Sequence, residues 1–324
     1  MAPALAVGAT VLVKPPHQAP GPTRLLAEIF ETAVRAITDP QEIIPLSTLQ
    51  VLNASNEVIS KAVSDPRIAI LSFTGSDRVG WMLRNQATHK KVALELGGNA
   101  GVIVHSDANL KRAAARCAFG GFAYAGQICI SVQRIFVHEE VAQRFTELFL
   151  SEVKKLVIGD PARQETVVGP LIDQAAADRV MAWIDEATQE GAHILLGGTR
   201  QESLISPTVL SGVKSQSKLC TEEVFGPVVV LNTYREFTEA IAAVNSSRYG
   251  LQAGVFTENL KLTHQAIENL DVGGILINEI PTYRADSMPY GGMKESGLGR
   301  EGVRYAMEEF SERKTVISWM GDRT

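Results

Sequence analysis

Two residues of this 324-residue chain have a type and a setting that could support covalent chemistry. Cys129 lies in the stretch 126–131, where Gly126 favours a loop with exposed amides, and such amides lower the pKa of a thiol and make it nucleophilic. Glu95 interrupts an apolar stretch, and burial of a carboxyl group raises its pKa towards that of a general base. Two alternatives stay open: Cys129 as an inert buried cysteine, and Glu95 as a paired or surface carboxylate on an edge strand.

A third feature is the turn at 73–80, where Phe-Thr-Gly-Ser follows a strand-like run and precedes a helix-like one. Amides at a helix N-terminus beside a glycine turn can bind the diphosphate of a cofactor. An ordinary strand–helix turn would look the same, because the sequence here is not the GxGxxG fingerprint of dinucleotide sites. Cys117 and Cys220 have no comparable setting, and we expect both to be buried.

Composition excludes several classes of protein. The chain is 45% hydrophobic and 21% charged, which is typical of a globular protein and not of a disordered or fibrous one. A net charge of −5 provides no basic field for nucleic acid or an anionic membrane, so we expect neither as a partner. Three cysteines without a CxxC pair and scattered histidines predict no disulfide framework, no metal site and a cytoplasmic protein.

Strand and helix signals alternate along the whole chain. Strands are predicted at 9–14, 68–73, 92–96, 100–104, 228–231, 254–256 and 274–278. Helices are predicted from Thr23 onward and at 77–87, 107–125, 138–156, 173–190 and 235–245. This alternation indicates parallel βαβ units in two doubly wound α/β domains. The run 316–319 predicts a terminal edge strand, which would be either an aggregation risk or a docking surface for another subunit.

Six motifs, taken together, resemble the aldehyde dehydrogenase superfamily and occur in the order of that family across nearly the whole chain. They are Lys14-Pro-Pro16, Phe73-Thr-Gly-Ser76, Glu95-Leu-Gly-Gly98, Gly126-Gln-Ile-Cys129, Glu222-Glu-Val-Phe-Gly-Pro227 and Pro289-Tyr-Gly-Gly-Met-Lys-Glu-Ser-Gly297. Glu95 and Cys129 are 34 residues apart, as are the base and the nucleophile in the family pattern. The 288–302 run and the Lys-Pro-Pro motif look most like the lactaldehyde, phosphonoacetaldehyde and non-phosphorylating glyceraldehyde-3-phosphate dehydrogenase branches.

The resemblance implies a reaction and the residues that perform it. The thiolate of Cys129 would attack an aldehyde, hydride would leave the thiohemiacetal to a nicotinamide, and water activated by Glu95 would hydrolyse the thioester to a carboxylic acid. The Cys129 amide would help to hold the oxyanion. The substrate implied is a small hydroxy- or anionic aldehyde, with Arg284 at the entrance. The alternative for Arg284 is an exposed surface residue or one paired with Asp286.

The cofactor implied by the resemblance is NAD or NADP. The residues expected to bind it are Lys14, His17, Gly75, Ser76, Val79, Gly80, Leu96, Glu223 and Phe225. His17 stands where the family often has a glutamate that grips the adenosine ribose. Because a histidine beside Lys14 need not repel a 2′-phosphate, we expect NADP to be tolerated or preferred.

The resemblance also implies an organisation: a partial dinucleotide-binding domain at 1–97, a catalytic domain at 98–306, and a C-terminal return and oligomerisation strand at 307–324 of a homo-oligomer. The family carries a segment before the position of Met1, with a Pro-Trp-Asn motif that this sequence lacks. We therefore expect the first domain to be truncated. The chain is then either a portion of a working dehydrogenase or an inactive relative with a structural, binding or esterase-like role.

Overall fold

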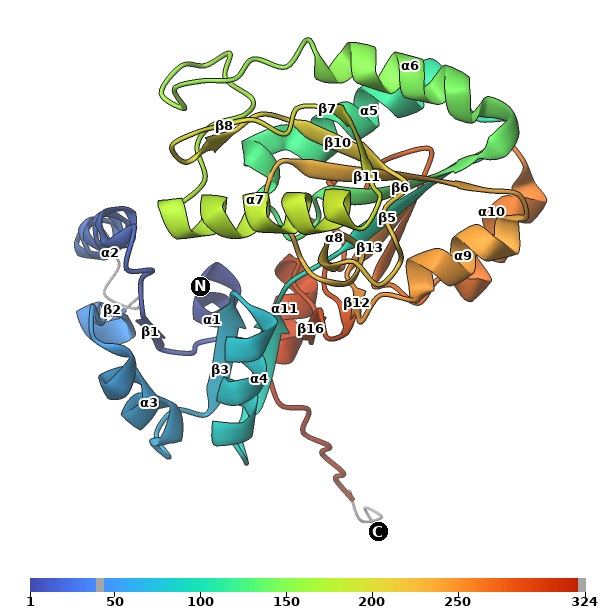
Figure 1. Cartoon of the computed structure of the whole chain (residues 1–324). Coiled ribbons are helices and arrows are strands. Elements are labelled where there is room, and N and C mark those ends of the chain that lie inside the picture. The colour runs from blue at the N-terminus through green and yellow to red at the C-terminus, as the bar shows by residue number, and fades with distance from the viewer. Residues whose placement is uncertain (39–43, 320–324) are drawn as a thin grey trace.

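The computed structural model describes residues 1–38 and 44–319. The larger part of the molecule is built on a seven-stranded sheet (Figure 1). Its strand order is β14-β13-β5-β6-β11-β10-β7, and only β7 runs antiparallel to its neighbour among these described strands. The strands are β5 (Ala100–Val104), β6 (Val132–His138), β7 (His193–Leu196), β10 (Thr208–Ser211), β11 (Val228–Tyr234), β13 (Gln252–Phe256) and β14 (Gly274–Ile277). The predicted parallel βαβ pattern is confirmed here.

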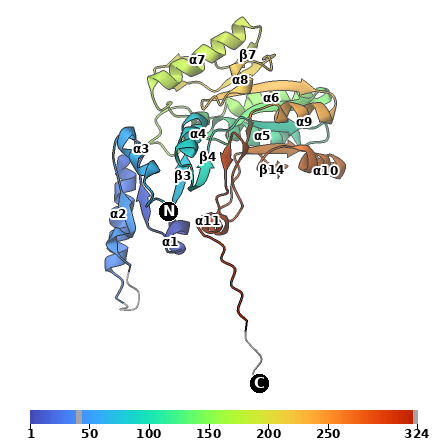
Figure 2. The same ribbon diagram turned by 90° about the horizontal axis from the view of Figure 1, so that it is seen from below.

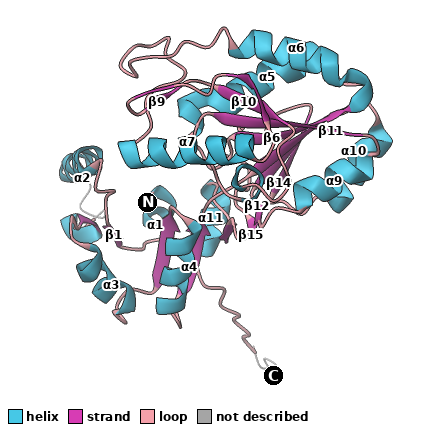
Figure 3. Cartoon of the chain, in the orientation of Figure 1, coloured by secondary structure: helices cyan, strands magenta, loops and turns pink. Residues whose placement is uncertain are grey.

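Helices cover both faces of this sheet, which explains why its central strands are apolar throughout (Figure 3). Val102 and Val104 of β5 belong to one buried cluster, and Ile103 between them belongs to a second cluster on the opposite face. The helices of the first cluster are α5 (Leu110–Phe122), α6 (Ala142–Val153), α7 (Gln174–Gln189) and α8 (Lys218–Thr221). Those of the second are α9 (Phe237–Asn245) and α10 (Leu260–Asn269).

The N-terminal elements form two smaller sheets beside the large one. A parallel pair joins β1 (Val11–Val13) to β2 (Leu49–Val51), and a three-stranded sheet has the order β16-β4-β3. The strands of the latter are β3 (Ile70–Thr74), β4 (Lys91–Glu95) and β16 (Gly297–Leu298). The helices here are α1 (Ala2–Ala6), α2 (Pro20–Arg35), α3 (Asn56–Ser64) and α4 (Asp77–Gln86). The predicted strands at 9–14 and 68–73 thus lie in separate sheets.

The C-terminal part of the chain returns to the N-terminal elements. Strand β16 pairs with β4, β15 (Met293–Lys294) pairs with β12 (Tyr249–Gly250), and α11 (Val303–Glu309) packs on α1. The remaining elements are η1 (Leu46–Thr48), η2 (Ala123–Gly126), η3 (Glu139–Val141), β8 (Arg200–Gln201) and β9 (Leu204–Ile205). Among the described residues, no helix is both long and apolar enough to cross a bilayer.

The strand predicted at 316–319 does not form within the single chain. Residues 311–319 form neither helix nor strand, and two views show them leading away from the body (Figures 1 and 2). The side chains of Val316, Ile317 and Trp319 are 80%, 90% and 92% exposed. A strand exists only where a partner supplies hydrogen bonds, and no such partner lies beside this run within the described ranges. Residues 320–324 of the predicted C-terminal segment lie outside the described residues.

Candidate active site

Cys129 lies in the loop between η2 and β6, and an unusual backbone shapes that loop. Tyr124, Ala125 and Gly126 have consecutive positive φ angles of 53°, 57° and 70°. Left-handed conformations are costly for residues with a Cβ and persist where the surrounding structure enforces them. A Cβ on Gly126 would overlap the main-chain carbonyl of Gly226, so only glycine fits there. The loop that carries the thiol is therefore fixed against the segment that follows Glu223.

A second glycine brings the predicted base motif onto the same loop. A Cβ on Gly98 would overlap the carbonyl oxygen of Cys129, so the Glu95-Leu-Gly-Gly98 turn lies in direct contact with the residue that carries the thiol. The Gly98 amide donates a 2.9 Å hydrogen bond to Glu223 Oε1. Three motifs that are far apart in the sequence, around Glu95, Cys129 and Glu223, thus meet in one place.

The thiol of Cys129 is held in a mostly apolar setting. Its Sγ lies 3.1 Å from the Oη of Tyr290, and Ile128 and Ile130 adjoin it. Burial raises the pKa of this thiol above its ordinary value, and the hydrogen bond from Tyr290 opposes that rise. Because the thiolate is the nucleophilic form, this cysteine needs a proton acceptor and a stabilising donor before it can react.

Glu95 is the last residue of β4, which has a neighbour on each side and is not an edge strand. The glutamate is only 9% exposed, and its Oε2 has no hydrogen-bond partner among the described residues. Burial raises the pKa of this carboxyl to about 8, and the charge of Glu301 adds to the rise. The cations of Arg284 and Arg300 act in the opposite direction. A carboxyl group that titrates near neutrality is suited to general-base chemistry.

The predicted cofactor turn lies against the Glu95 strand. The Gly75 amide donates to the carbonyl of Glu95 at 3.0 Å, while Gly75 and Ser76 stay exposed at the start of α4. Val79, in the 73–80 stretch, and Phe225, in the 222–227 motif, are large apolar residues that are 37% and 39% exposed. Phe225 has a φ of 47°. An exposed apolar side chain on the first turn of α4, such as Val79, fits a dinucleotide that lies across the glycine turn and the helix N-terminus.

The other residues predicted to bind the cofactor differ in how accessible they are. Gly80 is buried, and a Cβ there would overlap the Leu96 side chain, so Gly80 lets α4 pack onto Leu96. Only the main chain of Leu96 could face a ligand, because its side chain is 2% exposed. Burial raises the pKa of Glu223 to about 7, and the Gly98 amide opposes that rise. Lys14 and His17 follow β1 on the separate two-stranded sheet and, in the described chain, bond to none of the other predicted site residues.

Arg284 lies against the ring of Tyr290, and its ion-pair partner is not the predicted one. Its guanidinium pairs with Glu301 at 2.7 Å rather than with Asp286. The same guanidinium lies over the ring of Tyr290, with 4.3 Å between the cation and the ring centroid. Both side chains of the ion pair are about 40% exposed. The residue predicted to bind the substrate is thus already paired with a carboxylate, that of Glu301.

Sequence reasoning missed three residues that hold the site together. Tyr290 and Ser296 both lie in the 289–297 motif, which was the available signal, but they were given no role. Ser296 is fully buried and donates to the carbonyl of Gly97 at 2.7 Å. Arg248 pairs with the carboxylates of Asp77, Glu222 and Glu295, and thereby ties the start of α4 to the segments that follow α8 and β15. No local pattern marks Arg248, because its three partners are far from it in the sequence.

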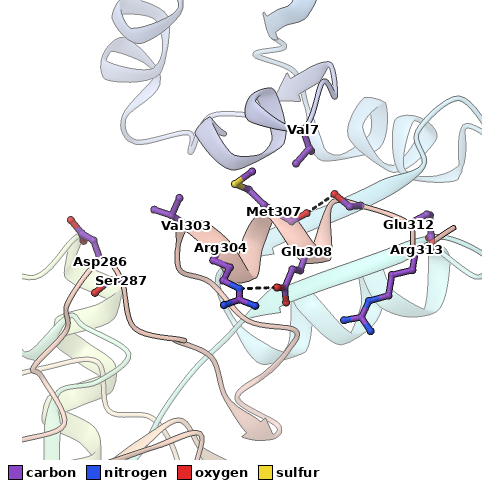
Figure 4. A pocket seen from close by; sticks show the side chains of 10 residues that line it. Val7, Asp286, Ser287, Val303, Arg304, Met307, Glu308, Glu312 and Arg313 are labelled. Carbon is purple, nitrogen blue, oxygen red and sulfur yellow. Dashed lines mark hydrogen bonds and ion pairs between the residues drawn. The ribbon is translucent and has the colours of Figure 1, made fainter. Parts of the chain in front are cut away.

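A groove of about 640 Å³ lies between α1 and α11, apart from these residues (Figure 4). Its lining includes Val7, Val303 and Met307, and Figure 4 shows the 3.0 Å ion pair between Arg304 and Glu308 along its wall. None of the predicted site residues is among the described residues that line it. The chemistry predicted from the motifs therefore does not map to this groove.

A sequence model of the aldehyde dehydrogenase family matches residues 1–316. The chain belongs to the aldehyde dehydrogenase family. Over 98% of its length it is 42% identical to 3-sulfolactaldehyde dehydrogenase of Priestia aryabhattai, of which it covers 65%. Over 97% it is 41% identical to lactaldehyde dehydrogenase of Methanococcus maripaludis, of which it covers 67%.

A solved aldehyde dehydrogenase structure agrees with these sequence matches. The structure of glyceraldehyde-3-phosphate dehydrogenase from Methanocaldococcus jannaschii, complexed with NADP, superposes with a TM-score of 0.91 at 40% identity. The match covers 96% of this chain and 67% of that one. The predicted aldehyde dehydrogenase-like α/β fold is confirmed, and the chain spans about two thirds of the length of these relatives.

Proposed function

We propose that this chain carries the catalytic centre of an NAD(P)-dependent aldehyde dehydrogenase that oxidises a small hydroxy- or anionic aldehyde to a carboxylic acid. The observation that supports this most is that three motifs meet. Gly98, in the same motif as Glu95, touches the backbone of Cys129 and donates a hydrogen bond to Glu223. Glycines that allow close backbone approach bring Cys129, Glu95 and Glu223 together, which supports assigning them the roles of nucleophile, base and cofactor-binding carboxylate.

In the proposed reaction, the Cys129 thiol gives its proton to Glu95, which passes it to solvent, and Sγ bonds to the carbonyl carbon of the aldehyde. The oxyanion that forms accepts a hydrogen bond from the Cys129 amide, which favours the tetrahedral state. Bound NAD(P)+ supplies the acceptor for the hydride that leaves this carbon. Glu95 then takes a proton from water, whose oxygen attacks the thioester carbonyl, and the C–S bond breaks to release the acid and restore Cys129.

Either nicotinamide cofactor fits the residues at the proposed site. Glu223 would accept from the hydroxyls of the nicotinamide ribose, and Val79 and Phe225 offer exposed apolar surface to the dinucleotide. His17 is exposed after β1, and no acidic side chain occupies its position. The NADP complex of the similar glyceraldehyde-3-phosphate dehydrogenase supports our proposal that NADP is accepted.

The substrate class is supported by the names of the relatives and by charge. These names refer to 3-sulfolactaldehyde, lactaldehyde and glyceraldehyde 3-phosphate, all small hydroxyaldehydes and two of them anionic. Arg284 lies over the ring of Tyr290, whose hydroxyl contacts the thiol, and it is the cation that an anionic tail would meet, in competition with Glu301. We further assign nucleotide binding to 1–97, catalysis to 98–306 and subunit contact to 307–324, in a cytoplasmic homo-oligomer.

The test is NAD(P)H formation by the purified chain with lactaldehyde, 3-sulfolactaldehyde, glyceraldehyde 3-phosphate, acetaldehyde and benzaldehyde, each with either cofactor. We expect turnover that is abolished by Cys129→Ala and faster with the hydroxyaldehydes than with the last two substrates. A chain that is folded but produces no NAD(P)H with any aldehyde would support the alternative of an inactive relative. A clear preference for NAD would refute the assignment of His17.

A further inference from the structure

We propose that the hydroxyl of Tyr290 is a positioning group that stabilises the thiolate of Cys129 when it forms, with Arg284 and Glu301 packed against Tyr290. The 3.1 Å distance between Oη and Sγ is the direct observation. The inference rests on the proposed function only in taking Cys129 as the nucleophile. A hydrogen bond to a charged acceptor is stronger than one to the neutral form, so this contact favours the thiolate.

The ring of Tyr290 has little freedom to move away from the thiol. It is 4% exposed and packs with Ile130 and Leu251 in a small buried cluster. Its main chain is paired with that of Glu301 through two hydrogen bonds, of 3.1 Å from the Tyr290 amide and 2.6 Å to its carbonyl. A phenylalanine would fill the same space, so the hydroxyl contributes only what its contact with Sγ provides.

Arg284 contacts the Tyr290 ring directly and is also linked to Tyr290 through Glu301. Its guanidinium lies 4.3 Å from the ring centroid and also pairs with Glu301, whose main chain is bonded to Tyr290. A cation over the face of a phenol is attracted to the ring and draws electron density from it, which makes the O–H a better donor. The cation thus acts on the thiol through Tyr290.

The other charged groups around the thiol act against ionisation. The charges of Glu223 and Glu95, where these groups are ionised, raise the pKa of the thiol, as burial does. The Cys129 amide and Tyr290 are the groups that favour the thiolate directly. Because Glu95, Glu223 and the apolar surroundings all disfavour a negative charge on Sγ, the Tyr290 hydroxyl contributes a large share of the interactions that stabilise the thiolate.

The test measures the rate of iodoacetamide alkylation against pH for the wild-type chain and for Tyr290→Phe, which removes only the hydroxyl. Cys117 and Cys220 are 0% and 7% exposed, and a Cys129→Ala chain shows any reaction they contribute. We expect the midpoint of the Cys129 profile to rise by about one pH unit, with alkylation about tenfold slower below it. The matched control, Tyr305→Phe on α11, should leave the profile unchanged.

A double-mutant cycle tests the part assigned to Arg284. Arg284→Met should raise the midpoint by less than Tyr290→Phe does, and should add little in the chain that already lacks the hydroxyl. An unchanged midpoint in Tyr290→Phe, with an unchanged thermal melt, overturns the proposal. So does an Arg284→Met effect that is equally large with and without Tyr290. Because alkylation needs neither cofactor nor aldehyde, a chain without dehydrogenase activity still decides this question.

Discussion

Replacing Glu95 with glutamine should stabilise the chain, and increasingly so as the pH rises. The residue is 9% exposed, one of its carboxyl oxygens has no hydrogen-bond partner among the described residues, and its pKa rises from an ordinary value of 4.5 to about 8. A folded-state pKa above the unfolded one means that folding is favoured while the group is protonated in both states. That contribution is lost as the pH rises from about 4.5 to about 8, because the unfolded chain ionises first.

The magnitude follows from that difference in pKa. At about 1.4 kcal/mol per pH unit, the wild-type chain loses roughly 3 kcal/mol of unfolding free energy by pH 7, and roughly 5 kcal/mol above pH 8. A glutamine has no charge to desolvate and avoids this loss at every pH. Any cost of burying its amide is independent of pH, so the pH dependence of the difference carries the prediction.

The assay is urea unfolding of the wild-type chain and Glu95→Gln at about pH 4, 7 and 9, with Glu165→Gln as an exposed control. The advantage of Glu95→Gln should be near its minimum at the lowest pH and grow by several kcal/mol towards the highest, while the control stays flat. A difference that does not change with pH would show that Glu95 is not desolvated in the folded chain. The same variant should lose thioester hydrolysis, which in the wild-type chain should rise with pH through about 8.

Two further substitutions test how the site is held together. Gly98→Ala places a methyl group onto the Cys129 carbonyl and should cost about 1–3 kcal/mol and slow Cys129 alkylation, whereas Gly21→Ala, with open space around it, should do neither. Urea unfolding midpoints measure the effect on stability, and alkylation rates measure the effect on Cys129. A Gly98→Ala chain that matches wild type in both would contradict the close contact between Gly98 and the Cys129 carbonyl. Ser296→Ala removes a buried hydroxyl that bonds to the Gly97 carbonyl and should cost about 1–3 kcal/mol, and a thermal melt unchanged from wild type would contradict this.

The sequence predicted those elements that depend on their own residues. The run 100–104 is apolar on both faces and became β5, fully buried between two clusters. The run 316–319 has the composition of a strand and forms none, because a strand also needs a neighbour that local sequence does not reveal. For the same reason the strands β1 and β3 were predicted correctly, but not that they would lie in separate sheets.

The candidate site was predicted to a similar depth. The types and order of the motifs indicated Cys129, Glu95 and Glu223, but not the contacts that join them. Those contacts depend on Gly98 and Gly126, where the missing Cβ lets two backbones approach, and a glycine in a sequence does not say what lies against it. Tyr290 was missed because a hydroxyl at an otherwise aromatic position acquires a role only when the fold places Sγ 3.1 Å away.

Arg284, predicted to meet the substrate or to pair with Asp286, is paired with Glu301 instead and can still serve a substrate. Its partner Glu301 reaches it only because the chain returns towards β4 before α11, an arrangement with no local sign in the sequence. Both side chains are about 40% exposed, and an ion pair so open to water contributes about 0–1 kcal/mol. A sulfonate or phosphate can therefore replace Glu301 at little cost, while the guanidinium stays over Tyr290. The ion pair between Arg284 and Glu301 is therefore compatible with an anionic aldehyde as the proposed substrate. It adds one requirement, which is that the carboxylate of Glu301 moves away from Arg284 when the substrate binds.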